Sequence, residues 1–230
     1  MSRPAILAFV FAVITPALAA AQGAPLQLGP KPGAPAQSAI QKAAPPARVA
    51  TPDAATAVKR ANAYLNSVST LVSDFVQTGA DGRKITGKLY VQKPGRLRFE
   101  YARPSPLEII ADGTSVAIRN RRLNTQDVYF ISQTPLKFLL KGNIDLARDT
   151  KILDVTSTAD TTSIRIEDRA TLGGTSRITL VFNTADFTLL RWAVNDAQGG
   201  DTLVALSNID LQQKPDPGLF RINHQRQDTF

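Results

Sequence analysis

The 230-residue sequence contains no cysteine, and it has one histidine and one tryptophan. The absence of cysteine excludes disulfides, zinc–thiolate sites and thiol catalysis. His224 lies near the C-terminus, where a lone histidine is more typical of a surface residue than of a catalyst. The hydrolase and phosphate-loop motifs G-x-S-x-G, S-x-x-K, H-E-x-x-H and the Walker loop are also missing. We therefore predict no catalytic residue, no metal site and no cofactor. The alternative is a pair of carboxylates formed by aspartates that are distant in sequence and meet in the fold.

The sequence also lacks an apolar run long enough to cross a bilayer. Arg3 precedes a short apolar run over residues 5–17, and small residues suitable for cleavage follow at 17–19 and 19–21. This pattern predicts a secretory signal peptide over residues 1–21, with an N-terminal membrane anchor as the alternative. No cysteine follows the cleavage positions, so the chain is not itself predicted to be lipidated. The rest of the protein is expected to be soluble and outside the cytoplasm.

Acidic residues are outnumbered, and the formal net charge is +8. Export makes nucleic acid an improbable partner, which leaves anionic lipid, an acidic protein or a plain solvated surface. Basic residues cluster at residues 92–98 and 118–124, next to expected turns. A possible docking patch for an acidic partner or anionic membrane consists of Arg119, Arg121 and Arg122.

Residues 22–51 are rich in proline and alanine and contain no acidic residue. Such a composition cannot bury enough apolar surface to order itself, so we predict a disordered tether, with a binding arm as the alternative. A folded domain is expected over residues 52–230. Its first element is a helix over about residues 52–68, with Thr51 as cap and Pro52 in the first turn. The apolar residues at helical spacing are Val58, Ala61, Leu65 and Val68.

The remaining chain has the pattern of a β-meander. Turn signals recur between short runs of alternating apolar residues, which predicts ten or eleven antiparallel strands in one curved sheet. Residues 134–142 break the pattern and predict a short apolar helix, capped by Thr134, with Pro135 in its first position. In two of the strands the predicted inward residues are Ile178, Leu180 and Phe182, and Leu190, Trp192 and Val194.

Residues 87–101, GKLYVQKPGRLRFEY, predict a β-hairpin with one apolar and one charged face. Pro94 and Gly95 suit the second and third positions of a type II turn, where the third position needs a positive φ. The apolar face would carry Leu89, Val91, Leu97, Phe99 and Tyr101. The opposite face would carry Lys88, Gln92, Arg96, Arg98 and Glu100, with Tyr90 as an exception.

Several blocks of the sequence, in order, resemble the periplasmic outer-membrane lipoprotein carriers of the LolA type. They are SDFVQT (73–78), the hairpin at 87–101, ADGTSVAI (111–118), PLKFLL (135–140), and DTLVALSNIDL (201–211) followed by GLFRI (218–222). The resemblance covers roughly residues 52–223. It implies an incomplete antiparallel β-barrel of about eleven strands, closed by a helical lid over a hydrophobic cavity.

The resemblance also implies a function without catalysis. Such a carrier takes acylated lipoproteins from an inner-membrane ABC transporter and delivers them to the outer membrane or to a receptor there, as a monomer in the periplasm. Lys93 would correspond to the basic residue that holds the lid, where the family more often has arginine. Tyr90 and Phe99 occupy positions that are often tryptophan. The expected acyl-chain cavity residues are Leu89, Val91, Leu97, Phe99, Tyr101, Leu136 and Leu139.

Three other hypotheses remain for the function of this protein. A protein of the same fold could bind another amphiphile or sense lipoproteins. An exported hydrolase on a β scaffold would need carboxylates that no motif marks. A basic envelope protein could merely bridge acidic surfaces. Each expected cavity residue could equally belong to an ordinary packed core.

Overall fold

The computed structural model describes residues 51–171, 173–196 and 200–223. The predicted signal peptide, the predicted tether up to residue 50, and His224 lie outside these residues. The helical elements in the described part are α1 (Ala54–Ser67), η1 (Ile131–Gln133), α2 (Lys137–Leu140), α3 (Leu146–Asp149) and η2 (Pro217–Phe220). The strands are β1 (Thr70–Thr78), β2 (Lys84–Gln92), β3 (Arg96–Tyr101), β4 (Leu107–Asp112), β5 (Ser115–Asn120), β6 (Thr125–Phe130), β7 (Lys151–Ser157), β8 (Thr161–Thr171), β9 (Gly174–Asn183), β10 (Leu189–Asn195) and β11 (Asp201–Asp210).

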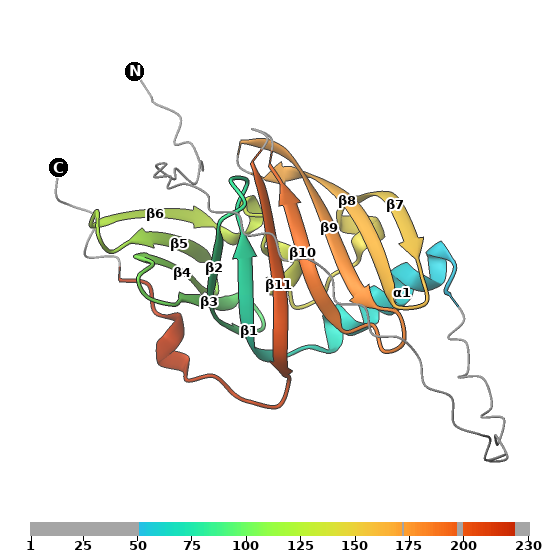
Figure 1. The fold of residues 1–230 in the computed structure, drawn as a ribbon, viewed down its shortest axis with the longest axis horizontal. Helices are drawn as coiled ribbons and strands as arrows, with labels where there is room; N and C mark the ends of the chain where they lie inside the picture. The colour runs from blue at the N-terminus through green and yellow to red at the C-terminus, as the bar shows by residue number, and fades with distance from the viewer. Residues whose placement is uncertain (1–50, 172, 197–199, 224–230) are drawn as a thin grey trace, which may run out of the picture. The chain divides into compact units, whose positions relative to one another are not determined.

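The strands form one antiparallel sheet of eleven strands, in the order β6-β5-β4-β3-β2-β1-β11-β10-β9-β8-β7. Neighbours in sequence are neighbours in the sheet, except that β11 returns to pair with β1, and β6 and β7 form the two ends. A sheet of this size curls, and Figure 1 shows it bending in front of α1 and the short helices. The predicted incomplete antiparallel barrel is therefore confirmed in its strand number and open topology.

Helix α1 lies across the inner face of the sheet. Its buried residues, Ala57, Val58, Ala61 and Leu65, recur every three or four positions, as predicted. The helix begins later than expected, because Asp53 is the N-cap and its carboxylate accepts from the Thr56 N–H at 2.9 Å. Capping by Thr51, with Pro52 in the first turn, was therefore wrong.

The expected helix at 134–142 is shorter than predicted. Only Lys137–Leu140 is α-helical, and Leu136 is its N-cap without a side-chain hydrogen bond. The Thr134 hydroxyl instead donates to the Ile131 carbonyl at 2.9 Å, so Thr134 ends η1 and does not cap α2. Phe138, Leu139 and Leu140 are nevertheless buried, which confirms that this segment faces apolar surroundings.

One strand departs from simple alternation. Ile178, Leu180 and Phe182 of β9 are buried together, as predicted. In β10 a register shift between Leu189 and Arg191 places Leu189 in the core, while Leu190 is half-buried. Trp192 is buried as expected, because the irregularity ends before it.

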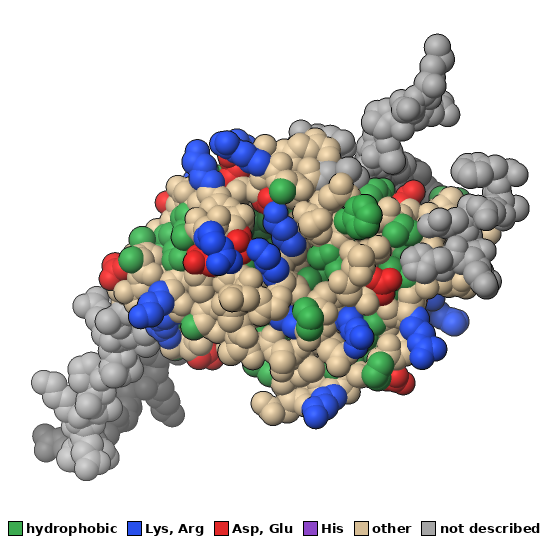
Figure 2. Space-filling model, turned by 180° about the vertical axis from the view of Figure 1, so that it is seen from behind, with side chains coloured by type: hydrophobic (Ala, Val, Ile, Leu, Met, Phe, Trp, Pro, Cys, Tyr) green, Lys and Arg blue, Asp and Glu red, His purple; other side chains and the backbone are tan. Residues whose placement is uncertain are grey.

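The hydrophobic core lies between the helices and the inner face of the sheet. Figure 2, which views the molecule from the side opposite to Figure 1, shows basic side chains spread over the surface on that side, with hydrophobic side chains reaching the surface between them. In the part of the chain that the structure describes, no helix combines the length and apolar character needed to cross a membrane.

Candidate functional site: the covered interior and the turn that joins its helices

The residues expected to line a cavity come together between the inner side of β2 and β3 and the segment of α2. The strand register pairs Leu89 with Phe99, Val91 with Leu97, and Gly87 with Tyr101. Directly paired residues share one face of a sheet, so these apolar side chains all point toward the helices. The residues that belong to this one cluster are Leu89, Val91, Leu97, Phe99, Tyr101 and Leu139, with Leu136 half-buried against it.

The charged face of the hairpin is also as predicted. Lys88, Arg96 and Glu100 are exposed, and Gln92 and Arg98 are half-buried on the outer side. Tyr90 pairs with Arg98 and shares this outer face. The hairpin thus separates an apolar interior from a polar exterior.

Aromatic rings fill the centre of the interior. Phe75 of β1 meets Phe99 edge-on, with ring centroids 5.0 Å apart, and Tyr101 at 5.2 Å. Trp192 contacts Phe99 at 6.4 Å and Phe138 of α2 at 5.9 Å. In this conformation the space beneath α2 is therefore packed with protein side chains.

Three of these rings were not among the expected site residues. Phe75, Phe138 and Trp192 each lie in segments whose patterns were recognised, but their meeting depends on strands far apart in sequence. Phe138 carried a usable signal, because it lies in the short apolar helix between Lys137 and Leu139. Phe75 carried none, because its position opposite Gly87 is set by the register of β1 with β2.

A polar pair is enclosed in the same interior. The Tyr101 hydroxyl donates to Gln77 Oε1 at 2.7 Å, and both side chains are buried. Burial raises the pKa of Tyr101 well above its ordinary value. Tyr101 therefore stays neutral and keeps an amphipathic ring at this end of the core.

The β2–β3 turn joins the ends of two helices. The Lys93 ammonium donates to the Leu65 carbonyl in the last turn of α1. The Gly95 N–H donates to the Leu140 carbonyl at the end of α2, at 2.9 Å. Helix C-terminal carbonyls lack partners within the helix and attract cations, so this one turn supplies a donor to a carbonyl at each helix end.

The environment of Lys93 opposes its charge. Burial lowers the pKa of Lys93 from 10.5 to about 8. The ammonium is thus held beside a backbone carbonyl in a site that favours the neutral amine more than water does.

The turn itself is not of type II. The Lys93–Pro94 peptide bond is cis, whereas a type II turn with Pro94 second has a trans bond there. Gly95 does have the expected positive φ, of 78°. A Cβ at Gly95 would lie 2.7 Å from the Gly113 carbonyl oxygen, so glycine is required for both backbone angle and space.

Helix α2 has a second attachment, to the opposite part of the sheet. Lys137 Nζ lies 2.7 Å from both carboxylate oxygens of Asp168 on β8. Asp168 is 2% exposed, so this ion pair is shielded from water. This contact could not be predicted from local sequence patterns, because the two residues lie on elements that only the folded sheet brings together.

Helix α1 is held by amide side chains and one arginine. Asn66 donates to the Ile144 carbonyl at 2.9 Å and accepts from the Ile144 N–H at 2.8 Å, and Asn62 accepts from the Leu146 N–H at 3.0 Å. Arg60 donates to the Ala185 carbonyl at 2.7 Å and stacks over Phe187, 4.2 Å from its centroid. Polar contacts at their edges therefore attach both helices over an apolar centre.

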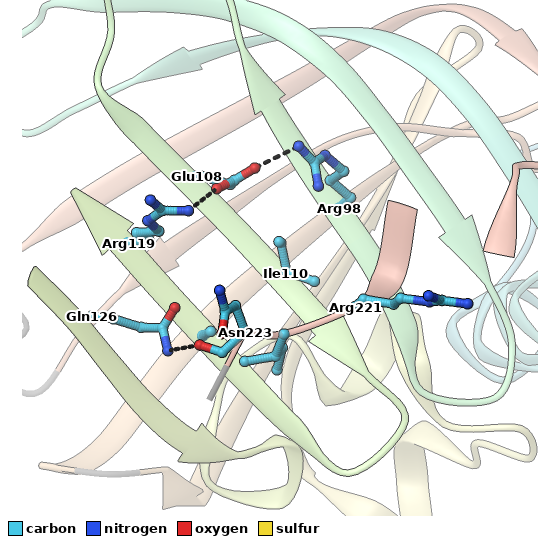
Figure 3. Close-up of a pocket in the computed structure, with 9 residues that line it drawn as sticks. Arg98, Glu108, Ile110, Arg119, Gln126, Arg221 and Asn223 are labelled. Carbon is cyan, nitrogen blue, oxygen red and sulfur yellow. Dashed lines mark hydrogen bonds and ion pairs between the residues drawn. The ribbon is translucent and has the colours of Figure 1, made fainter. Parts of the chain in front are cut away.

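The three arginines expected to form a docking patch do not share one environment. Arg119 is half-buried on the outer face of β5, 3.6 Å from the Glu108 carboxylate (Figure 3). Arg121 and Arg122 are exposed in the following turn, next to Leu123, which is 65% exposed. Docking at this turn stays a prediction.

Comparison with known proteins identifies the family to which the chain is similar. Residues 66–223 match the family described as outer membrane lipoprotein carrier protein LolA. An outer-membrane lipoprotein carrier protein of Chromobacterium violaceum is 27% identical over 175 residues, covering 73% of this chain and 84% of that protein. An uncharacterised protein of Rickettsia prowazekii is 31% identical over 86 residues, 37% of this chain and 40% of that protein.

Solved structures include a LolA superfamily protein from Nitrosomonas europaea, with a TM-score of 0.42 and 13% identity, covering 74% of this chain and 97% of that one. The family match itself extends from the end of α1 to the segment after η2, and so takes in every strand of the sheet. The chain therefore belongs to the LolA family of outer membrane lipoprotein carrier proteins.

Proposed function

We propose that this protein carries acylated lipoproteins through the periplasm, from an inner-membrane ABC transporter to the outer membrane or a receptor there. The protein acts by binding and releasing, without catalysis and without a cofactor. Acyl chains enter the apolar interior between the sheet and the helices. The observation that supports this function best is a continuous apolar interior. It is covered by helices that a few hydrogen bonds and ion pairs hold in place.

The energetics require such an interior. Burying one methylene is worth about 0.8 kcal/mol, so ten methylenes of an acyl chain correspond to about 8 kcal/mol. A lipoprotein therefore does not cross water without apolar cover. The same burial energy would make release of the acyl chain very slow, unless apolar side chains of the protein take the place of the acyl chain in the interior.

The packed interior supplies that alternative. In the conformation described here, Phe138 of α2 rests on Trp192, and Leu139 belongs to the same core. When cargo leaves, these side chains refill the space and recover much of the burial energy. Loading requires α1 and α2 to move away from the sheet, with Leu89, Val91, Leu97, Phe99, Tyr101, Leu136 and Leu139 as the acyl-chain contacts.

Lys93 is the proposed closing contact. It reaches the end of α1, and its neighbour Gly95 reaches the end of α2, so opening of either helix breaks a hydrogen bond at this turn. Lysine offers a point charge where arginine would offer a fork of donors. We infer that closure here is weaker than an arginine in the same place would give.

The remaining parts of the proposal concern place and partners. Residues 1–21 serve as a cleaved signal peptide, and residues 22–51 as a tether before the carrier domain at 52–230. The exposed turn with Arg121, Arg122 and Leu123 is the proposed contact with an anionic membrane or acidic partner. The carrier acts as a monomer.

A release assay tests the function. Spheroplasts that hold newly made triacylated lipoprotein are incubated with protein 22–230, and the soluble fraction is analysed for a one-to-one complex. We expect a soluble complex. If the protein instead emerges with phospholipid or another amphiphile and no lipoprotein, the fold assignment stands and the proposed cargo is wrong.

A matched pair of variants tests the site. Leu97→Glu places a carboxylate on the inner face of β3, whereas Arg96→Glu places one on the exposed outer face of the same strand. We expect the inner variant to lose lipoprotein release and the outer variant to retain it. Circular dichroism of both variants checks the fold, because a loss of lipoprotein release supports a cargo contact at Leu97 only if the Leu97→Glu protein remains folded.

A further inference from the structure

A second site lies on the outer face of the sheet, away from the proposed cargo interior. A cavity of about 200 Å³ opens over strands β3 to β6, beneath residues 221–223 (Figure 3). The strand register places its side chains on one face, because Arg98 pairs with Ile110, Ile110 with Ala117, Glu108 with Arg119, and Arg119 with Gln126. The strand residues that line it are Arg98, Glu108, Ile110, Ala117, Arg119 and Gln126.

The site has more positive than negative charge. Arg98 forms a charge-assisted hydrogen bond with the Glu108 carboxylate, and Arg119 lies 3.6 Å from that same carboxylate. Figure 3 shows both guanidinium groups turned toward Glu108 from opposite sides. One carboxylate thus faces two arginines whose side chains are 17% and 24% exposed.

Donors in this cluster are left without acceptors. Arg98 Nε is buried and has no hydrogen-bond partner in the described part of the chain. Arg119 is an ion-pair partner of Glu108 at 3.6 Å, which is beyond hydrogen-bonding distance. A buried donor without an acceptor is costly, so an additional acceptor in the cavity would stabilise the cluster.

The C-terminal segment forms the outer wall of the cavity. Arg98 Nη1 donates to the Leu219 carbonyl at 3.2 Å, and Gln126 donates to the Asn223 carbonyl at 3.0 Å. Phe220, the last residue of η2, is buried. The cavity is therefore built by residues far apart in sequence and fixed on two sides by hydrogen bonds.

We propose that this cavity binds a phosphate group, either free or as a phosphate ester. Guanidinium donors match phosphate oxygens, and the several oxygens of one phosphate can accept from two separate arginines. The cavity volume of about 200 Å³ suits a headgroup and is too small for a whole lipid. Ile110 and Ala117 supply an apolar floor for the carbon atoms of an ester.

The proposal is independent of lipoprotein carriage and is tested with purified protein. Calorimetric titration with glycerol 3-phosphate is performed on the parent protein, Arg119→Gln, and the control Arg191→Gln. Arg191 is exposed on β10 in the other half of the sheet, so its loss changes the net charge equally. We expect saturable binding that weakens about tenfold to a hundredfold in Arg119→Gln and is unchanged in Arg191→Gln.

Glu108→Gln makes the test sharper, because it predicts a gain. Replacing the competing carboxylate by an amide leaves both arginines unneutralised, so phosphate should bind several-fold more tightly. Arg119→Lys retains the charge but loses the fork, and should give an intermediate affinity. These two variants also carry the test if Arg119→Gln does not fold, as judged by thermal melting.

Vesicle co-sedimentation identifies the source of the phosphate. Vesicles of phosphatidylglycerol that bind the parent protein but not Arg119→Gln would assign a lipid headgroup, and glycerol 3-phosphate binding without vesicle binding would assign a soluble ester. The proposal is overturned if neither probe binds saturably, if Arg191→Gln weakens binding as much as Arg119→Gln, or if Glu108→Gln does not strengthen it.

Discussion

Lys93 combines two requirements at a single residue. Its ammonium is a donor for the end of α1, yet burial lowers its pKa to about 8. The unfolded chain keeps this proton up to about pH 10.5, the ordinary value for lysine. Between these two values the unfolded state binds more protons than the folded state, so the contribution of Lys93 to stability rises with pH.

Because the contribution of Lys93 to stability rises with pH, replacing Lys93 should matter more at high pH than at neutral pH. The free energy of unfolding of the parent protein, minus that of Lys93→Met, should become more favourable to the parent from pH 7 to pH 9.5. The neutral amine retains N–H donors for the Leu65 carbonyl, and the cost of burying a charge disappears. Urea unfolding of both proteins at the two pH values measures the difference. A difference that falls with pH would contradict the burial argument.

Gly87 is the second residue with a defined spatial role. A Cβ there would lie 2.2 Å from the Glu100 carbonyl oxygen and 2.7 Å from the Phe75 ring. Gly87→Ala should therefore lower the free energy of unfolding by about 1–3 kcal/mol, the usual range for overpacking. Gly79→Ala is the control, because its Cβ would meet only the movable Asp81 carboxylate, at 3.1 Å. Equal effects in urea unfolding would count against close packing of Phe75 on Gly87.

Helix α2 is a short element that is held by apolar contacts and by the ion pair between Lys137 and Asp168. Removing one partner of a buried ion pair leaves an uncompensated charge and typically costs about 3–5 kcal/mol. Lys137→Met leaves Asp168 in this position, so we expect a loss near the lower end of that range. Urea unfolding measures it.

Lys141→Met provides the comparison within the same segment. Lys141 pairs with Asp149 at 2.9 Å, but its side chain is about half exposed and Asp149 keeps Arg148 as a partner. Exposed pairs contribute at most about 1 kcal/mol. If Lys141→Met is as destabilising as Lys137→Met, the shielded position of Asp168 is not what makes its pair important.

The elements also mark the limit of sequence-based prediction. Alternation and turn residues predicted the hairpin at 87–101 and the inward face of β9, because local periodicity alone determines them. The helix caps were wrong at Thr51 and Thr134, where a threonine competed with a nearby aspartate or with a 3₁₀ turn. The shift at Leu190 was missed because a bulge leaves no signal in residue type.

Contacts between distant strands were beyond local patterns altogether. Arg119 was grouped with Arg121 and Arg122 because they are adjacent in sequence. Its ion pair with Glu108 arises from the pairing of β4 with β5, and Arg98 joins them from β3. The site at these residues therefore became visible only with the register of three strands.

At the scale of the whole domain, the open sheet and its helices form one apolar interior with a natural reporter. Trp192 is the single tryptophan of the chain. It is 1% exposed and lies against Phe138 of α2 and Phe99 of β3. Any movement of α2 away from the sheet changes the surroundings of this one ring.

The last prediction uses this ring to follow loading directly. A synthetic triacylated lipopeptide should change the Trp192 emission saturably, because acyl carbons replace Phe138 beside the indole, whereas the same peptide without acyl chains should have no effect. Lys137→Met should reach half-saturation at lower lipopeptide concentration, since less energy is needed to free α2 from Asp168. Lys141→Met should match the parent protein. If the lipopeptide binds without altering Trp192 emission, acyl chains occupy a surface other than the interior beneath α2. The side chains of the core would then keep their packing, and α2 would stay in place during transport.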